Sequence, residues 1–274
     1  MPIHNINNKP EPTDPGNYAL LNGREPDWGR IKDAGIVGVP PREVIARLNR
    51  QQATIHDLDE PLVRADSPAA ELLPQVYCAI LRTVAANALQ LELDAIFIDT
   101  GAGKCDGARY TARILAETLT IPVIACDNRD TAPQGHPLCR SDLPLAELMS
   151  RITAGVKIAG SSGSEPAPCP PRAGFWGVPP RDFSLLELFP GQTHVYGWTR
   201  CLENKTPADH ELESYFNPAV PTVFFAQNFC PKTALARFLA VRHPRALYLD
   251  ADMQCGGSAR AKIQAFFELS GVEL

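Results

Sequence analysis

Short apolar or β-branched runs alternate with amphipathic stretches along most of the chain. Runs this short, bounded by turn residues, are typical of buried strands, whereas the amphipathic stretches have the apolar spacing of helices. Strands that alternate with helices predict an α/β fold with parallel sheets covered on both faces. The predicted strands are 35–39, 53–58, 95–99, 122–126, 174–178, 195–198, 220–226 and 246–250. The predicted helices begin near residue 42 and cover 75–90, 108–118, 143–158, 184–188, 232–241 and 259–269.

The second half of the chain repeats landmarks of the first half in the same order. Residues 34–43 read AGIVGVPPRE, and residues 173–182 read AGFWGVPPRD. Two shorter pairs of matching segments follow. In the last pair each segment ends in an Asp, which precedes a cysteine and then an arginine. These pairs are Gln75–Cys78 with Gln227–Cys230 and Ala95–Asp99 with Ala246–Asp250. We therefore predict two similar Rossmann-like domains related by a pseudo-two-fold axis, with a site in the cleft between them.

The predicted domain boundaries follow changes in amino-acid composition along the chain. Residues 1–29 are polar and rich in proline and asparagine, which predicts an irregular arm. The first α/β domain is expected over 30–160 and the second over 173–274, joined by a linker rich in Gly, Ser and Pro at 161–172. A chain of 274 residues is long enough for two domains with separate cores.

Charge and hydropathy exclude several classes of function. The net charge of −5 and the isoelectric point near 5.7 argue against a nucleic-acid surface, which needs a basic stripe. No apolar stretch is long enough to span a membrane, and the polar start lacks a signal region, so we expect a cytoplasmic protein. In that compartment the eight cysteines are expected to be thiols that bind metal, catalyse a reaction or fill the core.

Most of the cysteines follow predicted strands, where ligands bind in α/β sheets. Cys230 precedes Pro231, which favours a helix N-terminus, and the helix dipole stabilises a thiolate there. Cys105 and Cys255 follow Gly-rich turns, and Cys78 matches Cys230 in the repeat. The spacing fits neither zinc knuckles nor a ferredoxin run, so ligands from both domains would assemble a cluster in the cleft. The candidate ligands are Cys78, Cys105, Cys230 and Cys255.

Four arginines stand at matched positions beside these cysteines. Arg42 and Arg181 open helices after a strand, whereas Arg109 and Arg260 lie close after the second pair of cysteines. Each alone is most simply a solvated or ion-paired surface residue. As matched pairs they are expected to offset the negative charge of a thiolate-ligated cluster or to hold a carboxylate or phosphate.

Several motifs together resemble those of a known family. They are Val39-Pro40-x-x-Glu43 after the first strand, Pro74-x-x-Tyr77-Cys78-x-x-x-Arg82, Leu93–Ile98, Cys105-Asp106-x-x-Arg109, Pro122–Ile124, and the strands ending near Cys201 and Cys255. The set is similar to the 2-hydroxyacyl-CoA dehydratase D-component family, which includes benzoyl-CoA reductase cluster subunits and double-cubane cluster proteins. The resemblance covers roughly residues 34–274.

The resemblance implies a [4Fe-4S] cluster or a double-cubane cluster in the cleft, with Cys78, Cys105 and Cys255 as ligands. Cys230 is the symmetric fourth ligand, and Cys126 and Cys201 would serve only a larger cluster. The implied activity is an oxygen-sensitive, low-potential reduction or dehydration. The implied partners are an ATP-dependent activator, a second copy or a paralogous subunit, and an acyl-CoA or another small-molecule substrate.

Two other functions remain open at the level of sequence. Cofactor-independent amino-acid racemases also place one cysteine from each of two similar domains across a cleft, as acid and base. That function would use the paired arginines to hold a carboxylate, but it leaves Cys105 and Cys255 without a role. The other alternative is a non-catalytic subunit that carries a cluster for a partner.

Overall fold

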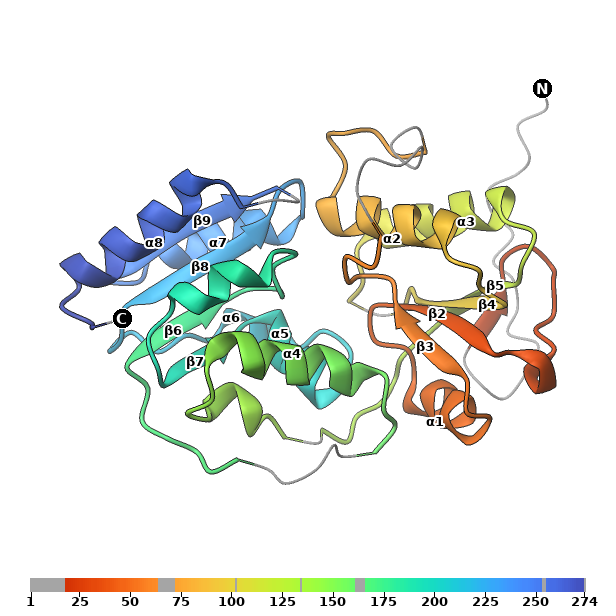
Figure 1. Ribbon diagram of the computed structural model, residues 1–274, viewed down its shortest axis with the longest axis horizontal. Helices are drawn as coiled ribbons and strands as arrows, with labels where there is room; N and C mark the ends of the chain where they lie inside the picture. The colour runs from red at the N-terminus through yellow and green to blue at the C-terminus, as the bar shows by residue number, and fades with distance from the viewer. Residues whose placement is uncertain are drawn as a thin grey trace.

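The computed structural model describes residues 18–63, 72–101, 103–133, 135–160, 166–252 and 255–273. It is an α/β protein with two separate sheets that lie side by side (Figure 1). The first is a mixed sheet of five strands and the second is a parallel sheet of four. This confirms the predicted fold class of two Rossmann-like sheets, with one antiparallel strand added to the first.

The first sheet has the order β1-β5-β4-β2-β3. Strands β2 to β5 are parallel, and β1 pairs with β5 in the antiparallel direction. Helices α2 and α3 cover one face and α1 covers the other (Figure 1). The strands are β1 (Tyr18–Leu20), β2 (Asp33–Val37), β3 (Thr54–Asp57), β4 (Ala95–Asp99) and β5 (Val123–Cys126). The helices are η1 (Trp28–Arg30), α1 (Arg42–Arg50), α2 (Ala79–Gln90) and α3 (Asp106–Thr118).

The second sheet has the order β7-β6-β8-β9, with all strands parallel. Apolar side chains of α4 and α8 pack on one face, whereas α7 packs on the other. The strands are β6 (Ala173–Trp176), β7 (Thr193–Tyr196), β8 (Thr222–Gln227) and β9 (Ala246–Ala251). The helices are η3 (Leu138–Arg140), α4 (Leu145–Val156), η4 (Phe183–Leu188), α5 (Trp198–Asn204), α6 (His210–Ser214), α7 (Lys232–Ala240) and α8 (Gly257–Leu269).

Helix α4 follows the first sheet in sequence but packs with the second. It contacts α5 and η4, and its apolar residues join a core cluster that extends from α1 into the second sheet. The chain therefore crosses between the sheets after β5, ahead of the sequence-based boundary at residue 160. The predicted linker begins after α4, and its residues 161–165 lie outside the described residues.

The two parallel sets share one strand order, but the repeated segments match it only in part. β2 and β6 are each the first parallel strand of their sheet, so the repeated decapeptides occupy equivalent places. Cys78 begins the helix between the second and third parallel strands, whereas Cys230 precedes the helix between the third and fourth. By strand order the counterpart of Cys230 is therefore Cys105, because each lies between the third parallel strand and the next helix.

The structure also differs from the sequence-based elements at several points. Strand β1 lies within the predicted irregular arm, whose residues 1–17 are outside the described part. The helix expected from residue 75 begins at Ala79, and the strand expected to reach Trp198 ends at Tyr196. Gly197 takes a φ of 79°, a conformation that glycine adopts readily, and α5 begins directly after it. Among the described residues, no helix is long and apolar enough to cross a membrane.

Candidate functional site

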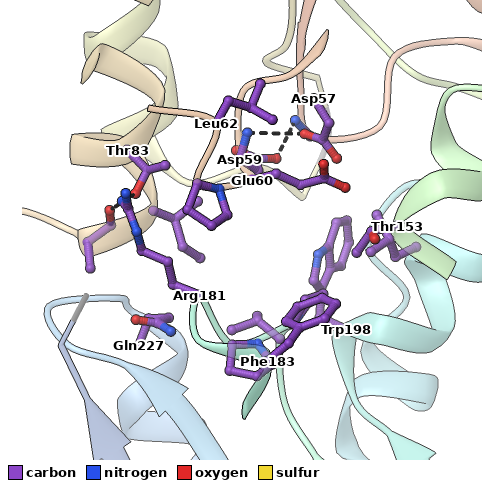
Figure 2. Close-up of a pocket in the computed structure, with 18 of the residues that line it drawn as sticks. Asp57, Asp59, Glu60, Leu62, Thr83, Thr153, Arg181, Phe183, Trp198 and Gln227 are labelled. Carbon is purple, nitrogen blue, oxygen red and sulfur yellow. Dashed lines mark hydrogen bonds between the residues drawn. The ribbon is translucent and has the colours of Figure 1, made fainter. Parts of the chain in front are cut away.

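A cavity of about 390 Å³ lies between the two halves of the molecule. Its walls come from the loops after β2 and β3, the first turns of α2, helix α4, the loop after β6, helix α5 and the end of β8 (Figure 2). The volume is in the range of small-molecule sites. The position agrees with the sequence-based prediction that a site would lie beyond the carboxyl ends of the strands.

Two of the predicted cysteines meet at the edge of this cavity. Cys78 is the N-cap of α2, and Cys230 stands directly before Pro231, the N-cap of α7. Both are almost fully buried, and their side chains are hydrogen-bonded to each other. The backbone N–H of Ala79 also donates to the carbonyl of Asn228 at 3.3 Å. A thiol from each half of the molecule therefore contributes to one pair.

The contact makes the two thiols chemically unequal. The hydrogen bond from Cys230 lowers the pKa of Cys78 to about 7, against the effect of burial, and the N–H groups of Leu81 and Ile80 lower it further. The same hydrogen bond raises the pKa of Cys230, as do burial and the charge on Cys78. The favoured state is a Cys78 thiolate that accepts the hydrogen bond of the Cys230 thiol. The first turn of α2 supplies the donors that hold the negative charge.

Cys105 lies on the same side of the first sheet as Cys78. It is the exposed N-cap of α3. A Cβ added to Gly107 would stand 3.7 Å from the Cys105 Sγ and 3.3 Å from the Tyr77 hydroxyl. That hydroxyl donates to the Gly107 carbonyl at 3.0 Å, so the start of α3 is tied to the residue before Cys78.

Cys255 has different neighbours. It is half-buried before α8, where burial and the negative charge of Asp182 raise its pKa to about 11, and Arg260 opposes them. Within the described part of the chain, no group of three or more Cys, His, Asp or Glu side chains is placed to hold a metal ion. The structure thus joins two of the four predicted ligands in direct contact.

The remaining cysteines have core or loop environments. Burial raises the pKa of Cys126 and of Cys139, and it raises that of Cys201 to about 11. All three are buried. Cys169 is half-buried and lies near His194, with Sγ and Nε2 3.8 Å apart. None of these environments favours a thiolate.

The predicted arginines do not gather around the thiols. Arg42 donates to the carbonyls of Ala132 and Asn204, and Arg109 donates to the Thr100 carbonyl at 3.2 Å. Arg260 donates to Ser184. Only Arg181 lines the cavity, where it donates to the Thr83 hydroxyl.

Sequence reasoning missed the acidic end of the cavity, which is formed by Asp57, the last residue of β3, and by Asp59 and Glu60 directly after it. Asp57 accepts a hydrogen bond from the Asp59 N–H at 3.1 Å, and Asp59 accepts one from the Gly38 N–H at 2.8 Å. Burial raises the pKa of Asp57 well above its usual range and that of Asp59 to about 6. The available signal was a run of carboxylates directly at a strand end.

Two lysines approach this end of the cavity. The Lys157 ammonium pairs with Glu60 at 3.3 Å, and the Lys104 ammonium pairs with the buried Asp99 at 2.8 Å. Lys104 also stands 4.3 Å from the ring centre of Trp198, which comes from the second half. Lys104 therefore connects the first sheet to the aromatic wall of the cavity.

Further polar contacts hold the halves together near the thiols. Arg82 on α2 pairs with Asp252, which follows β9, at 2.6 Å. Arg181 reaches Thr83 on the same helix. These contacts, together with the thiol pair, fasten the first turns of α2 to the second sheet. Neither the protein-family models nor the curated proteins give a match to this chain.

Proposed function

We propose that this chain is an iron–sulfur cluster subunit of a low-potential reductase or dehydratase-like enzyme. The observation that carries the proposal is the contact between Cys78 and Cys230, one thiol from each half, at the edge of an interdomain cavity. Both thiols lie at helix N-termini, and Cys78 favours the thiolate, the form that binds iron.

The residues present fit such a group in their chemistry. Cys78 and Cys230 would hold the cluster together with Cys105, whose thiol stands near the start of α2 and is exposed. Burial and the charge of Asp182 raise the pKa of Cys255 to about 11, which makes it the weakest of the predicted ligands. When bound, the cluster would supply single electrons at low potential.

The protein itself would bind and shield the reactant. Ala79 and Gln227 line the cavity, one and three residues from the paired cysteines. The apolar walls exclude water, and Asp59, whose pKa is about 6, is suited to hold or release a proton. An ATP-dependent activator would supply electrons, and a second or paralogous subunit would complete the enzyme. A cavity next to the thiols favours a catalytic subunit over a chain that only carries a cluster.

A two-cysteine acid–base enzyme is the second candidate, favoured by the opposed pKa shifts of Cys78 and Cys230. Pairs of groups whose pKa values are pushed apart are typical of acid–base sites. Direct contact between the thiols argues against it, because the carbon that exchanges its proton would have to lie between them.

The test is anaerobic purification followed by iron and sulfide analysis and a visible absorption spectrum. The proposal predicts a brown protein with about four irons and four sulfides per chain, or about eight irons for a double cubane. Serine variants of Cys78, Cys105 and Cys230 should each lower the iron content, whereas Cys169→Ser, outside the site, should keep it. A colourless, iron-free, air-stable protein would reject the cluster and leave the acid–base candidate.

A further inference from the structure

We propose that the interdomain cavity binds a small compound with an ammonium group at one end, a carboxylate at the other and an apolar chain between them. The inference concerns the cavity and does not require the cluster. It rests on a wall where carboxyl groups outnumber the ammonium groups beside them, on a guanidinium on another wall, and on the apolar surface between them.

The acidic wall carries more carboxylates than cations. Among the described residues, the cations that act on Asp57, Asp59 and Glu60 are the ammonium groups of Lys104 and Lys157. Lys104 is also paired with Asp99, which is buried behind the wall. Asp57 is 4% exposed and lines the cavity, and the described residues give its carboxyl one donor, the Asp59 N–H. Its second oxygen is therefore available to a donor inside the cavity.

These carboxylates suit an organic cation better than a metal ion. In the described part of the chain they do not converge as a group that could hold a metal. An ammonium group offers three hydrogen-bond donors and a charge, which match acceptors spread along one wall. Burial raises the pKa of Asp57 and of Asp59, and an ammonium group beside them would offset the cost of desolvating their ionised forms.

The opposite charge lies across the cavity. Figure 2 shows Arg181 beside Thr83, on the other side of the view from Asp57, Asp59 and Glu60. Arg181 and the neighbouring Arg82 repel each other, and Asp252 is the carboxylate that acts on both. Within the described residues, the Arg181 side chain donates only to Thr83, which leaves guanidinium N–H groups for a carboxylate.

Apolar groups separate the two charged walls. Figure 2 shows the rings of Phe183 and Trp198 next to each other on a third wall, and Leu62, Ile80 and Val178 also line the space. A volume of about 390 Å³ accommodates a short chain and is small for a coenzyme A thioester. The cavity therefore favours a free amino carboxylate.

Isothermal titration calorimetry on the anaerobically purified full chain tests this with four probes: 6-aminohexanoate, hexanoate, hexylamine and acetyl-CoA. We expect 6-aminohexanoate to bind about tenfold or more tightly than hexanoate or hexylamine, since each lacks one charged contact. Asp59→Asn should remove the advantage over hexanoate, and Arg181→Gln the advantage over hexylamine. Glu147→Gln, a surface change away from the cavity, should leave all affinities unchanged.

The outcomes separate this inference from the cluster. No binding of 6-aminohexanoate, binding that Asp59→Asn and Asp57→Asn both leave unchanged, or binding of acetyl-CoA alone would overturn it. Iron content measured on the same samples reports independently on the cluster. If Asp59→Asn does not fold, as judged by circular dichroism, Asp59→Glu replaces it, because a longer carboxylate shifts the acidic wall and should still weaken binding.

Discussion

At the scale of single residues, the decisive feature is how neighbours make similar groups unequal. Cys78 and Cys230 are both buried thiols, yet backbone donors of α2 and the Cys230 thiol favour the ionised form of Cys78 alone. Asp57 and Asp59 show the reverse effect, because burial favours their neutral forms. Whether a side chain at this site is ionised therefore depends on nearby hydrogen-bond donors and on burial more than on the residue type.

Cys78 is predicted to be the more reactive of the paired thiols in iron-free protein. Its alkylation by iodoacetamide should rise with pH through about 7, because the thiolate is the nucleophile. Cys230→Ser replaces the thiol donor with a different one and should change that midpoint, whereas Cys169→Ser should not. Quenched-flow labelling with peptide mass spectrometry gives the rates. A Cys78 profile identical in both variants would contradict the hydrogen-bonded pair.

Stability is predicted to fall as pH rises from about 4 to about 6. The pKa of Asp59 is raised from 3.8 to about 6, so the folded state binds more protons than the unfolded state in this window. Asp59→Asn should flatten the slope, and Asp57, whose pKa is also raised, should keep part of it. Urea unfolding at several pH values measures this. If the stability of Asp59→Asn depended on pH as steeply as that of the parent chain, Asp59 would ionise freely in the folded state.

At the scale of elements, close packing explains why a glycine recurs in the first parallel strand of each sheet. A Cβ on Gly35 would stand 2.9 Å from Leu58 Cδ1, and one on Gly174 would stand 2.5 Å from Thr222 Oγ1. Both contacts are shorter than packed side chains allow. The glycine in the repeated decapeptide is therefore required by strand packing at equivalent places in the two sheets.

Gly174→Ala is predicted to destabilise the protein by about 1–3 kcal/mol, because the buried Tyr196 and Thr222 leave no room for a methyl group. Gly155→Ala on α4 is the matched control. Apart from its chain neighbours and its own helix backbone, no atom of the described residues lies within 4 Å of its added Cβ, so helix propensity should raise the stability by up to about 1 kcal/mol. Chemical denaturation measures both. Equal effects of the two changes would argue against the packing of β6.

Sequence patterns predicted the strands well because their residues are buried and β-branched or aromatic. They missed α5 because its buried face includes Thr199, Arg200 and Glu203, which leave no apolar period to detect. They missed α6, although its N-cap Asp209 accepts from two backbone N–H groups and was a readable signal. Cys78 and Cys230 were predicted together, but their contact depends on how the two sheets pack, which local patterns do not encode.

At the scale of the whole molecule, the site exists only where the halves meet. The thiol pair, the Arg82–Asp252 ion pair and the bond between Arg181 and Thr83 all cross from α2 to the second sheet. The acidic wall and the aromatic wall of the cavity also come from different halves. Any motion that separates the sheets would open the cavity and part the thiols together.

Mild oxidation is predicted to join the two halves of the molecule by a disulfide bond. In iron-free protein, diamide should convert the Cys78 and Cys230 thiols to a disulfide while its azo bond takes up the two hydrogens, because the thiols are already in contact. Non-reducing peptide mapping should find this bond in the parent chain and in Cys255→Ser. Its absence from the parent chain, or its replacement by a bond to Cys255, would contradict the described pairing.

The crossing between Cys126 and Leu138 has a consequence for how such a protein can be encoded. Every strand of the first sheet precedes the crossing, and every strand of the second follows it. A gene divided at this point would yield two polypeptides, each with its own complete sheet. Their association would rebuild the cavity and the thiol pair by complementation, so a fissioned heterodimer is an alternative form of the same site.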